Sequence, residues 1–169
     1  MSINNNRIDE SVPQMVDVDI YLALLEEQCN NRYDAYRIIL EKQKEKTIGD
    51  SVRKGKRVVE GIRTQIRNAS RELTETPSYR LLRRNTLVKN IRTLRASLRN
   101  AEKEQGLENR IIESRITRAT LNSLQTYRES LELYFKDYKN SLGTHKSVPQ
   151  EKLDRDIRYI PEIPNRDIL

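Results

Sequence analysis

Apolar residues recur every three or four positions through most of the chain, which is typical of long amphipathic helices. Between residues 50 and 73 they form a regular heptad series, and after residue 80 the series resumes and continues to about residue 142. The first series contains Val52, Gly55, Val59, Ile62, Ile66, Ala69 and Leu73, and the second begins with Leu87, Ile91, Leu94, Leu98 and Ala101. The pattern predicts an all-α protein whose helices bury a narrow, coiled-coil-like apolar stripe.

A break over residues 74–79 separates the two series. Pro77 lacks a backbone donor and disfavours helix at Thr76, so we expect the turn here, with Thr76 as the cap of the following helix. Gly143 suits the carboxyl end of that helix. The sequence therefore predicts a long antiparallel helical hairpin over residues 14–143.

The glycines of the two arms suggest a further feature. The register set by the turn places Gly55 opposite Leu98 and leaves Gly49 and Gly106 nearly level. Each glycine weakens its helix by about 1 kcal/mol relative to alanine. We therefore expect bends near Gly49 and Gly106 in two long helices. The alternative is that the arms break at these points and fold back as a four-helix bundle.

The hairpin is flanked by two other segments. Residues 1–13 are expected to be an irregular N-terminal segment, and residues 144–169 an extended docking tail, in which 151–156 could form one helical turn. Pro161 and Pro164 favour extended backbone, and a stiff extended segment loses little entropy on binding. The dock is either a neighbouring subunit or the base of the same hairpin near the termini. This aromatic base is expected to contain Tyr21, Tyr33, Tyr36, Tyr127, Tyr134, Phe135 and Tyr138. The predicted partner-docking residues are Ile157, Tyr159, Ile160, Pro161, Ile163, Pro164, Ile168 and Leu169.

Positive charge is concentrated near the turn. The chain has a net charge of +7, yet residues 51–105 alone hold 15 basic and 5 acidic side chains. Most charge runs are solvated helix faces, but like charges destabilise a helix, so the scarcity of acids favours an acidic partner. With Tyr79 as the one aromatic there, nucleic acid would be contacted at its phosphates rather than its bases. The predicted binding residues are Arg53, Lys54, Lys56, Arg57, Arg63, Arg67, Arg71, Arg80, Arg83, Arg84, Lys89, Arg92, Arg95 and Arg99.

Signals for chemistry are sparse. His145 is the single histidine, in a polar segment, and Cys29 is the single cysteine, within a helical pattern. Neither spacing indicates zinc, and no glycine-rich phosphate loop occurs. We therefore expect no enzyme activity, no metal site and no cofactor. The chain has no run of 18 apolar residues and begins without a signal-peptide pattern. These features predict an intracellular location, cytosolic or nuclear, or one within a virus particle, rather than secretion.

Two functions agree with this pattern. The first is a non-catalytic structural or assembly subunit of a larger complex, such as a viral or phage particle, with a helical strut, a basic end and a partner-docking tail. The alternative is a helical arm that binds nucleic acid without sequence specificity. The expected partners are protein subunits and, in the alternative, nucleic acid. The apolar stripe is also compatible with a homo-oligomer.

Overall fold

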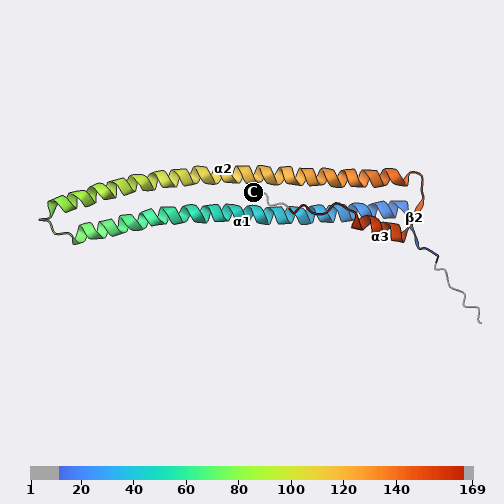
Figure 1. The fold of residues 1–169 in the computed structure, drawn as a ribbon, viewed down its shortest axis with the longest axis horizontal. Helices are drawn as coiled ribbons and strands as arrows, with labels where there is room; N and C mark the ends of the chain where they lie inside the picture. The colour runs from blue at the N-terminus through green and yellow to red at the C-terminus, as the bar shows by residue number, and fades with distance from the viewer. Residues whose placement is uncertain (1–11, 166–169) are drawn as a thin grey trace, which may run out of the picture. The chain divides into compact units, whose positions relative to one another are not determined.

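The computed structural model describes residues 12–165, and the described chain is mostly helical (Figure 1). Its two long helices, of 58 and 62 residues, pack against each other, and a short helix of nine residues follows. The predicted helical class is therefore confirmed. The elements in chain order are β1 (Met15–Asp17), α1 (Val18–Glu75), α2 (Leu81–Leu142), β2 (Ser147–Pro149) and α3 (Gln150–Arg158).

The described chain divides into two compact units, and both long helices contribute to each. Unit 1 contains residues 12–39 and 122–165, and unit 2 contains residues 40–121. Unit 1 therefore combines two segments that are far apart in the sequence, whereas unit 2 is one continuous stretch. Each unit is described separately below.

In unit 2, α1 continues without interruption through Gly49, and α2 continues through Gly106. Two long helices are therefore found in place of the four shorter ones of the alternative. The bends near these glycines stay a prediction. A Cβ atom at either position would have no neighbour within 4 Å.

The predicted neighbour of Gly55 on α2 is wrong. Gly55 lies against the side chain of Gln105, where Leu98 was expected. Two physical reasons account for the shift. The loop between the helices is centred on Ser78, one residue later than assumed. Side chains on a helix also lean toward its N-terminus, so that the long Gln105 side chain reaches back along α2 to the level of Gly55.

The apolar stripe of unit 2 follows the predicted heptads. Val59, Ala69, Leu87 and Ile91 are buried, and the remaining members of both series are half-buried. Few side chains are fully enclosed, because two helices alone cover only one face of each other. The stripe gives unit 2 a thin core and leaves most of its surface to polar residues.

The turn differs in detail from the prediction. Thr76 bonds back to the carbonyl oxygen of Glu72 through both its amide (2.9 Å) and its hydroxyl (2.6 Å), so it terminates α1 and does not cap α2. The guanidinium of Arg84 donates to the carbonyl oxygens of Leu73 (3.1 Å) and Thr76 (2.6 Å). These carbonyls at the end of α1 have no partner within the helix, and Arg84 supplies one.

Unit 1 closes with a two-stranded antiparallel sheet. Val16 of β1 pairs with Val148 of β2, and Val148 is buried. Gly143, with a φ of 51°, ends α2 as predicted and starts the return toward β1. β1 begins at Met15 and α1 at Val18, whereas the first helix was expected to start near Gln14 or Asp17. Of the predicted irregular segment 1–13, only residues 12 and 13 are described, and they have no regular structure.

Candidate interaction surfaces

The segment after β2 is bound by unit 1 itself. α3 lies beside the first part of α1 (Figure 1), and the chain then continues irregularly from Tyr159 to residue 165. The prediction of an extended tail is therefore wrong for residues 150–158, which form the nine-residue helix α3 where at most one helical turn was expected, at 151–156. The physical reason is long-range pairing. The amide of Gln150 donates to the carbonyl of Gln14 (2.8 Å), and Leu153 is buried, so one side of α3 has a partner to pack on.

Arg32 of α1 holds the end of α3. Its guanidinium donates to the carbonyl oxygens of Ile160 (2.6 Å), Ile157 (3.3 Å) and Pro161 (3.4 Å). The hydroxyl of Tyr127 donates to the same Pro161 carbonyl (2.9 Å). Carbonyls at the end of a helix and in an irregular segment lack partners of their own, and these two side chains provide them.

A second set of contacts surrounds Asp156, which is buried. Its carboxylate accepts hydrogen bonds from the Tyr21 hydroxyl and from the Lys152 ammonium (3.0 Å), and its carbonyl accepts one from the Tyr134 hydroxyl. Lys152 lies 5.6 Å from the ring centre of Tyr21 and 5.4 Å from that of Tyr138. The buried carboxylate is thus paired with a cation and with hydroxyl donors, as a buried charge requires.

Three tyrosines of unit 1 have a raised pKa, which favours the neutral hydroxyl. Burial raises the pKa of the Tyr21 hydroxyl, and the negative charge of Asp156 raises it further. Burial also raises the pKa of Tyr134, with a smaller contribution from the neighbouring Tyr138, and it raises the pKa of Tyr127. A neutral hydroxyl can donate the hydrogen bonds described above, whereas a phenolate cannot.

The predicted docking residues differ in how far they are buried. Ile160 is only 1% exposed, and its backbone is bound by Arg32, so the tail docks on the base of its own chain. Tyr159 is 66% exposed. Docking on a separate partner stays a prediction. The members that are half-buried are Ile157, Pro161, Ile163 and Pro164, and Ile168 and Leu169 lie outside the described residues.

Sequence reasoning missed the side chains that receive the tail. Arg32 lies on the buried face of α1, because Leu25 and Cys29, seven and three residues before it, and Tyr36, four residues after it, are all buried. An arginine at a position of this apolar stripe was the signal in the sequence that could have identified it. In the structure, Tyr36 packs edge-to-face on Tyr127 with ring centres 5.1 Å apart. The tyrosines were predicted to form an aromatic base, but their role as hydrogen-bond donors to a backbone was not.

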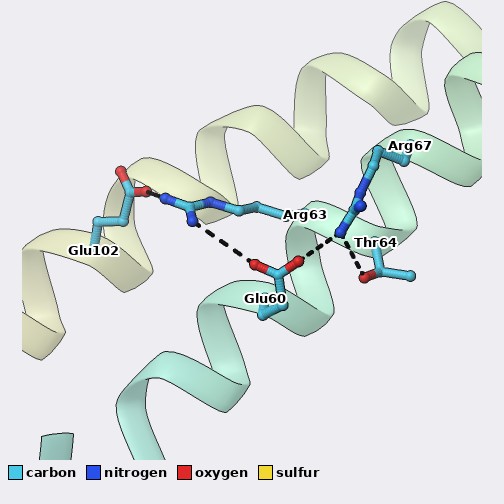
Figure 2. A network of polar contacts seen from close by, with 5 residues as sticks. All are labelled: Glu60, Arg63, Thr64, Arg67 and Glu102. Atoms are coloured by element: carbon cyan, nitrogen blue, oxygen red, sulfur yellow. Dashed lines mark hydrogen bonds and ion pairs between the residues drawn. The ribbon is translucent and has the colours of Figure 1, made fainter. Parts of the chain in front are cut away.

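The predicted basic residues are exposed in unit 2 with one exception. Arg84 is half-buried and serves the turn, so its predicted role in binding a partner is replaced by the structural one described above. Four others make ion pairs with acidic side chains: Arg53 with Asp50, Arg83 with Glu72, and Arg63 and Arg67 with the residues of Figure 2. These four are partly neutralised within the chain.

Figure 2 shows how one acidic residue serves two arginines. Glu60 accepts from Arg67 at 2.5 Å and lies 3.8 Å from Arg63, which itself bonds to Glu102 of α2 at 3.0 Å. All four side chains are exposed to solvent, a setting in which each pair contributes about 0–1 kcal/mol. The network fixes the direction of two arginines rather than the stability of the unit.

Nine predicted cations remain exposed with no carboxylate within 4.0 Å among residues 12–165. We call them the open cations. Five come from α1 or the loop and four from α2. They are Lys54, Lys56, Arg57, Arg71, Arg80, Lys89, Arg92, Arg95 and Arg99.

The loop between the long helices and the first two residues of α2 expose apolar side chains, and we call this segment, residues 76–82, the apolar loop. Tyr79 is 78% exposed, Leu81 67% and Leu82 86%. They surround Arg80, one of the open cations. Three large apolar residues side by side on a described surface are unusual, since single exposed ones are the normal case.

Unit 1 contains a cleft of about 520 Å³ between α1 and α2, which we call the Cys29 cleft. Burial raises the pKa of the Cys29 thiol, so the cysteine behaves as a small apolar residue. The lining combines apolar side chains with three carboxylates and one arginine. Its members are Glu26, Cys29, Asn30, Tyr33, Asp34, Arg128, Leu131, Glu132 and Phe135.

Other kinds of site were sought in the described chain. Between residues 12 and 165, no group of three or more His, Cys, Asp and Glu side chains is placed to hold a metal ion. No helix in that range is long and apolar enough to cross a membrane. His145 is exposed, and its ring Nδ1 lies 2.6 Å from the carbonyl oxygen of Leu142 in the loop after α2.

Comparison with known proteins gave no relative: no protein-family model, no curated protein and no solved structure matches this chain.

Proposed function

We propose that this chain is a non-catalytic structural subunit that binds an anionic partner through the open cations of unit 2. The nine open cations carry this proposal. Unit 2 contains 21 basic and 10 acidic side chains, whereas the described part of unit 1 contains 9 basic and 12 acidic ones. Uncompensated positive charge on a helix is unfavourable by itself and is relieved by an anionic partner.

In this proposal α1 and α2 form an intramolecular antiparallel hairpin with coiled-coil-like packing. Each helix keeps the other's apolar stripe covered, and the cations occupy the outer faces. The continuous helices hold neighbouring cations at fixed spacing, so less conformational entropy is lost when a partner binds. A non-catalytic role agrees with the buried Cys29 and the exposed, single His145.

A more specific candidate for the partner is nucleic acid, bound through its phosphates. Arg92, Arg95 and Arg99 are exposed and lie at i, i+3 and i+7, which places them on one face of α2. Arginine pairs with phosphate through two parallel hydrogen bonds. Sequence-independent binding of this kind depends strongly on salt.

The test measures affinity for a duplex of about 30 base pairs as a function of salt. One variant changes Arg57, Arg92, Arg95 and Arg99 to Gln. The matched control changes the ion-paired Arg53, Arg63, Arg67 and Arg83 to Gln and removes the same charge. Each lost phosphate contact lowers the log–log salt slope by about 0.9, so the first variant should lose up to about 3–4 and the control markedly less.

Equal losses in the two variants would contradict the proposed site, because net charge alone would then explain binding. If the affinity for the duplex does not change with salt concentration, binding through phosphates is contradicted. In that case an acidic protein surface would be the partner to seek, and the structural role would be tested by co-purification of the full chain.

A further inference from the structure

The apolar loop and the Cys29 cleft have complementary chemistry. Tyr79, Leu81 and Leu82 offer exposed apolar side chains around the positive Arg80. The cleft offers apolar surface from Leu131 and other lining residues, framed by carboxylates. The apolar loop carries positive charge and the Cys29 cleft carries mainly negative charge, and both are partly apolar. Protein–protein interfaces combine these features.

The charges of the cleft explain why a basic segment fits there. Glu26 makes no ion pair with any residue of the described chain, while Glu132 bonds to Arg128 at 3.0 Å and Asp34 to Arg37 at 3.2 Å. An entering arginine would therefore find one free carboxylate and two that are partly neutralised. A volume of about 520 Å³ lies within the usual range for sites that enclose several side-chain-sized groups.

We propose that the loop of one copy, residues 76–82, docks in the Cys29 cleft of a second copy. The loop's leucines and Tyr79 meet the apolar lining, and Arg80 pairs with Glu26. This inference rests on the structural role proposed above and names another copy of the chain as a partner. The two surfaces differ, so the contact is heterologous: each copy keeps one unused loop or cleft, and association closes as a ring or continues as a chain.

The contact is small, and small interfaces are weak. Sedimentation velocity at low salt, from micromolar to millimolar concentration, is therefore the measurement. In the loop variant, Leu81→Ser with Leu82→Ser, we expect at least a tenfold loss of association. The control is Leu107→Ser with Leu121→Ser, because these leucines are also exposed in unit 2 and lie outside the loop. All four residues are exposed, so the helical circular dichroism should stay unchanged.

A mixing experiment distinguishes this contact from a symmetric one. The cleft variant, Glu26→Lys with Glu132→Lys, should also lose self-association. An equimolar mixture of loop variant and cleft variant should form one-to-one pairs and stop there. In such a pair, the intact cleft of the first accepts the intact loop of the second. A mixture that stays monomeric would overturn the proposal.

The failure of this inference and the failure of duplex binding give different results. A wild-type chain that binds duplex but stays monomeric at all concentrations overturns the docking contact and leaves the proposed function standing. Vesicles containing phosphatidylserine provide the third arm. If the loop variant loses vesicle binding while wild-type self-association is absent, the loop's partner is an anionic lipid surface and the proposal is wrong.

Discussion

Arg32 connects α1 to the last described segment through main-chain carbonyls alone. It donates to three of them, at Ile157, Ile160 and Pro161. Hydrogen bonds from a charged donor stabilise a fold by about 1.5–3 kcal/mol, more than neutral ones. Arg37, five residues later, makes only an exposed ion pair with Asp34. Arg32 therefore binds the main chain of a distant segment, whereas Arg37 binds only a neighbouring side chain of its own helix.

Replacing Arg32 by methionine keeps the aliphatic stem and removes the donors. We expect unit 1 to lose about 2–3 kcal/mol of stability, because the carbonyls lose their partners. Urea unfolding followed by tyrosine fluorescence measures this, since seven of the eight tyrosines lie in unit 1 and the chain has no tryptophan. Arg37→Met is the control and should change stability by less than about 0.5 kcal/mol. Equal effects would contradict the role given to Arg32.

The raised pKa values of Tyr21 and Tyr134 predict a dependence on alkaline pH. In the unfolded chain both hydroxyls ionise near pH 10, whereas in the folded chain they keep their protons to higher pH. The folded state therefore binds more protons above pH 10. Stability should be constant below pH 10 and fall above it, by about 1.4 kcal/mol per pH unit for each retained proton.

Urea midpoints between pH 8 and pH 11.5 measure this fall. Tyr21→Phe should lower stability at neutral pH, because the bond to Asp156 is lost, and should also flatten the alkaline slope. The exposed Tyr159, changed to Phe, is the control and should leave the slope as it is. An unchanged slope in Tyr21→Phe would show that other groups cause the alkaline loss.

At the scale of the helices, the glycines of unit 2 separate backbone preference from packing. A Cβ at Gly61 would have no neighbour within 4 Å, whereas one at Gly55 would lie 2.6 Å from atoms of the Gln105 side chain. Alanine favours helix over glycine by about 1 kcal/mol in both places. The difference between the two substitutions therefore measures the cost of moving Gln105.

We predict that Gly61→Ala stabilises unit 2 by about 0.5–1 kcal/mol. Gly55→Ala should give less than this or destabilise, because Gln105 must leave its place over the glycine. The double variant Gly55→Ala with Gln105→Ala removes the conflict and should recover the gain. Thermal melts by far-ultraviolet circular dichroism measure all three. A full gain from Gly55→Ala alone would mean that Gln105 moves freely.

The helices were predictable because their signal is local. The heptad series identified Val59, Ala69, Leu87 and Ile91 as buried, and Pro77 located the turn. The neighbour of Gly55 on α2 was not predicted, because it depends on the lean and length of the Gln105 side chain. Consequently the exposure of the arginines followed from the sequence, but the pairing of Arg63 with Glu102 across the helices did not.

The structure of unit 1 was harder to predict from the sequence, for a different reason. β1 and β2 have three residues each, too few for an alternating pattern to stand out, and they pair residues 130 or more positions apart. The two prolines predicted an extended tail, which is found only after α3. The aromatic base was predicted, yet the sequence could not show that its hydroxyls and Arg32 would bind the tail's own backbone.

At the scale of the molecule, the division into two units predicts that each can unfold separately. A chain that ends at residue 155 lacks Asp156, Ile160 and the carbonyls that Arg32 binds. We expect its tyrosine signal to unfold at lower urea, while most of the far-ultraviolet signal persists because unit 2 keeps its own contacts. A chain that ends at residue 165 keeps the described contacts and is the control.

Simultaneous loss of both signals in the shorter chain would contradict separate unfolding. It would mean that the unfolding of unit 1 spreads to unit 2 through α1 and α2, because both helices run through both units. The proposed hairpin would then behave as one cooperative structure.

The assembly of unit 1 from two distant segments also has a consequence during protein synthesis. Residues 12–39 leave the ribosome long before residues 122–165, which contain their partners. Unit 2 is one continuous stretch, and its contacts join residues that are closer in the sequence, so it can fold first. During this delay several side chains that are buried in the folded unit stay exposed to solvent, among them Tyr21, Leu25 and Tyr36. The amino-terminal part of α1 therefore exposes apolar side chains to solvent for longer than any other part of the described core.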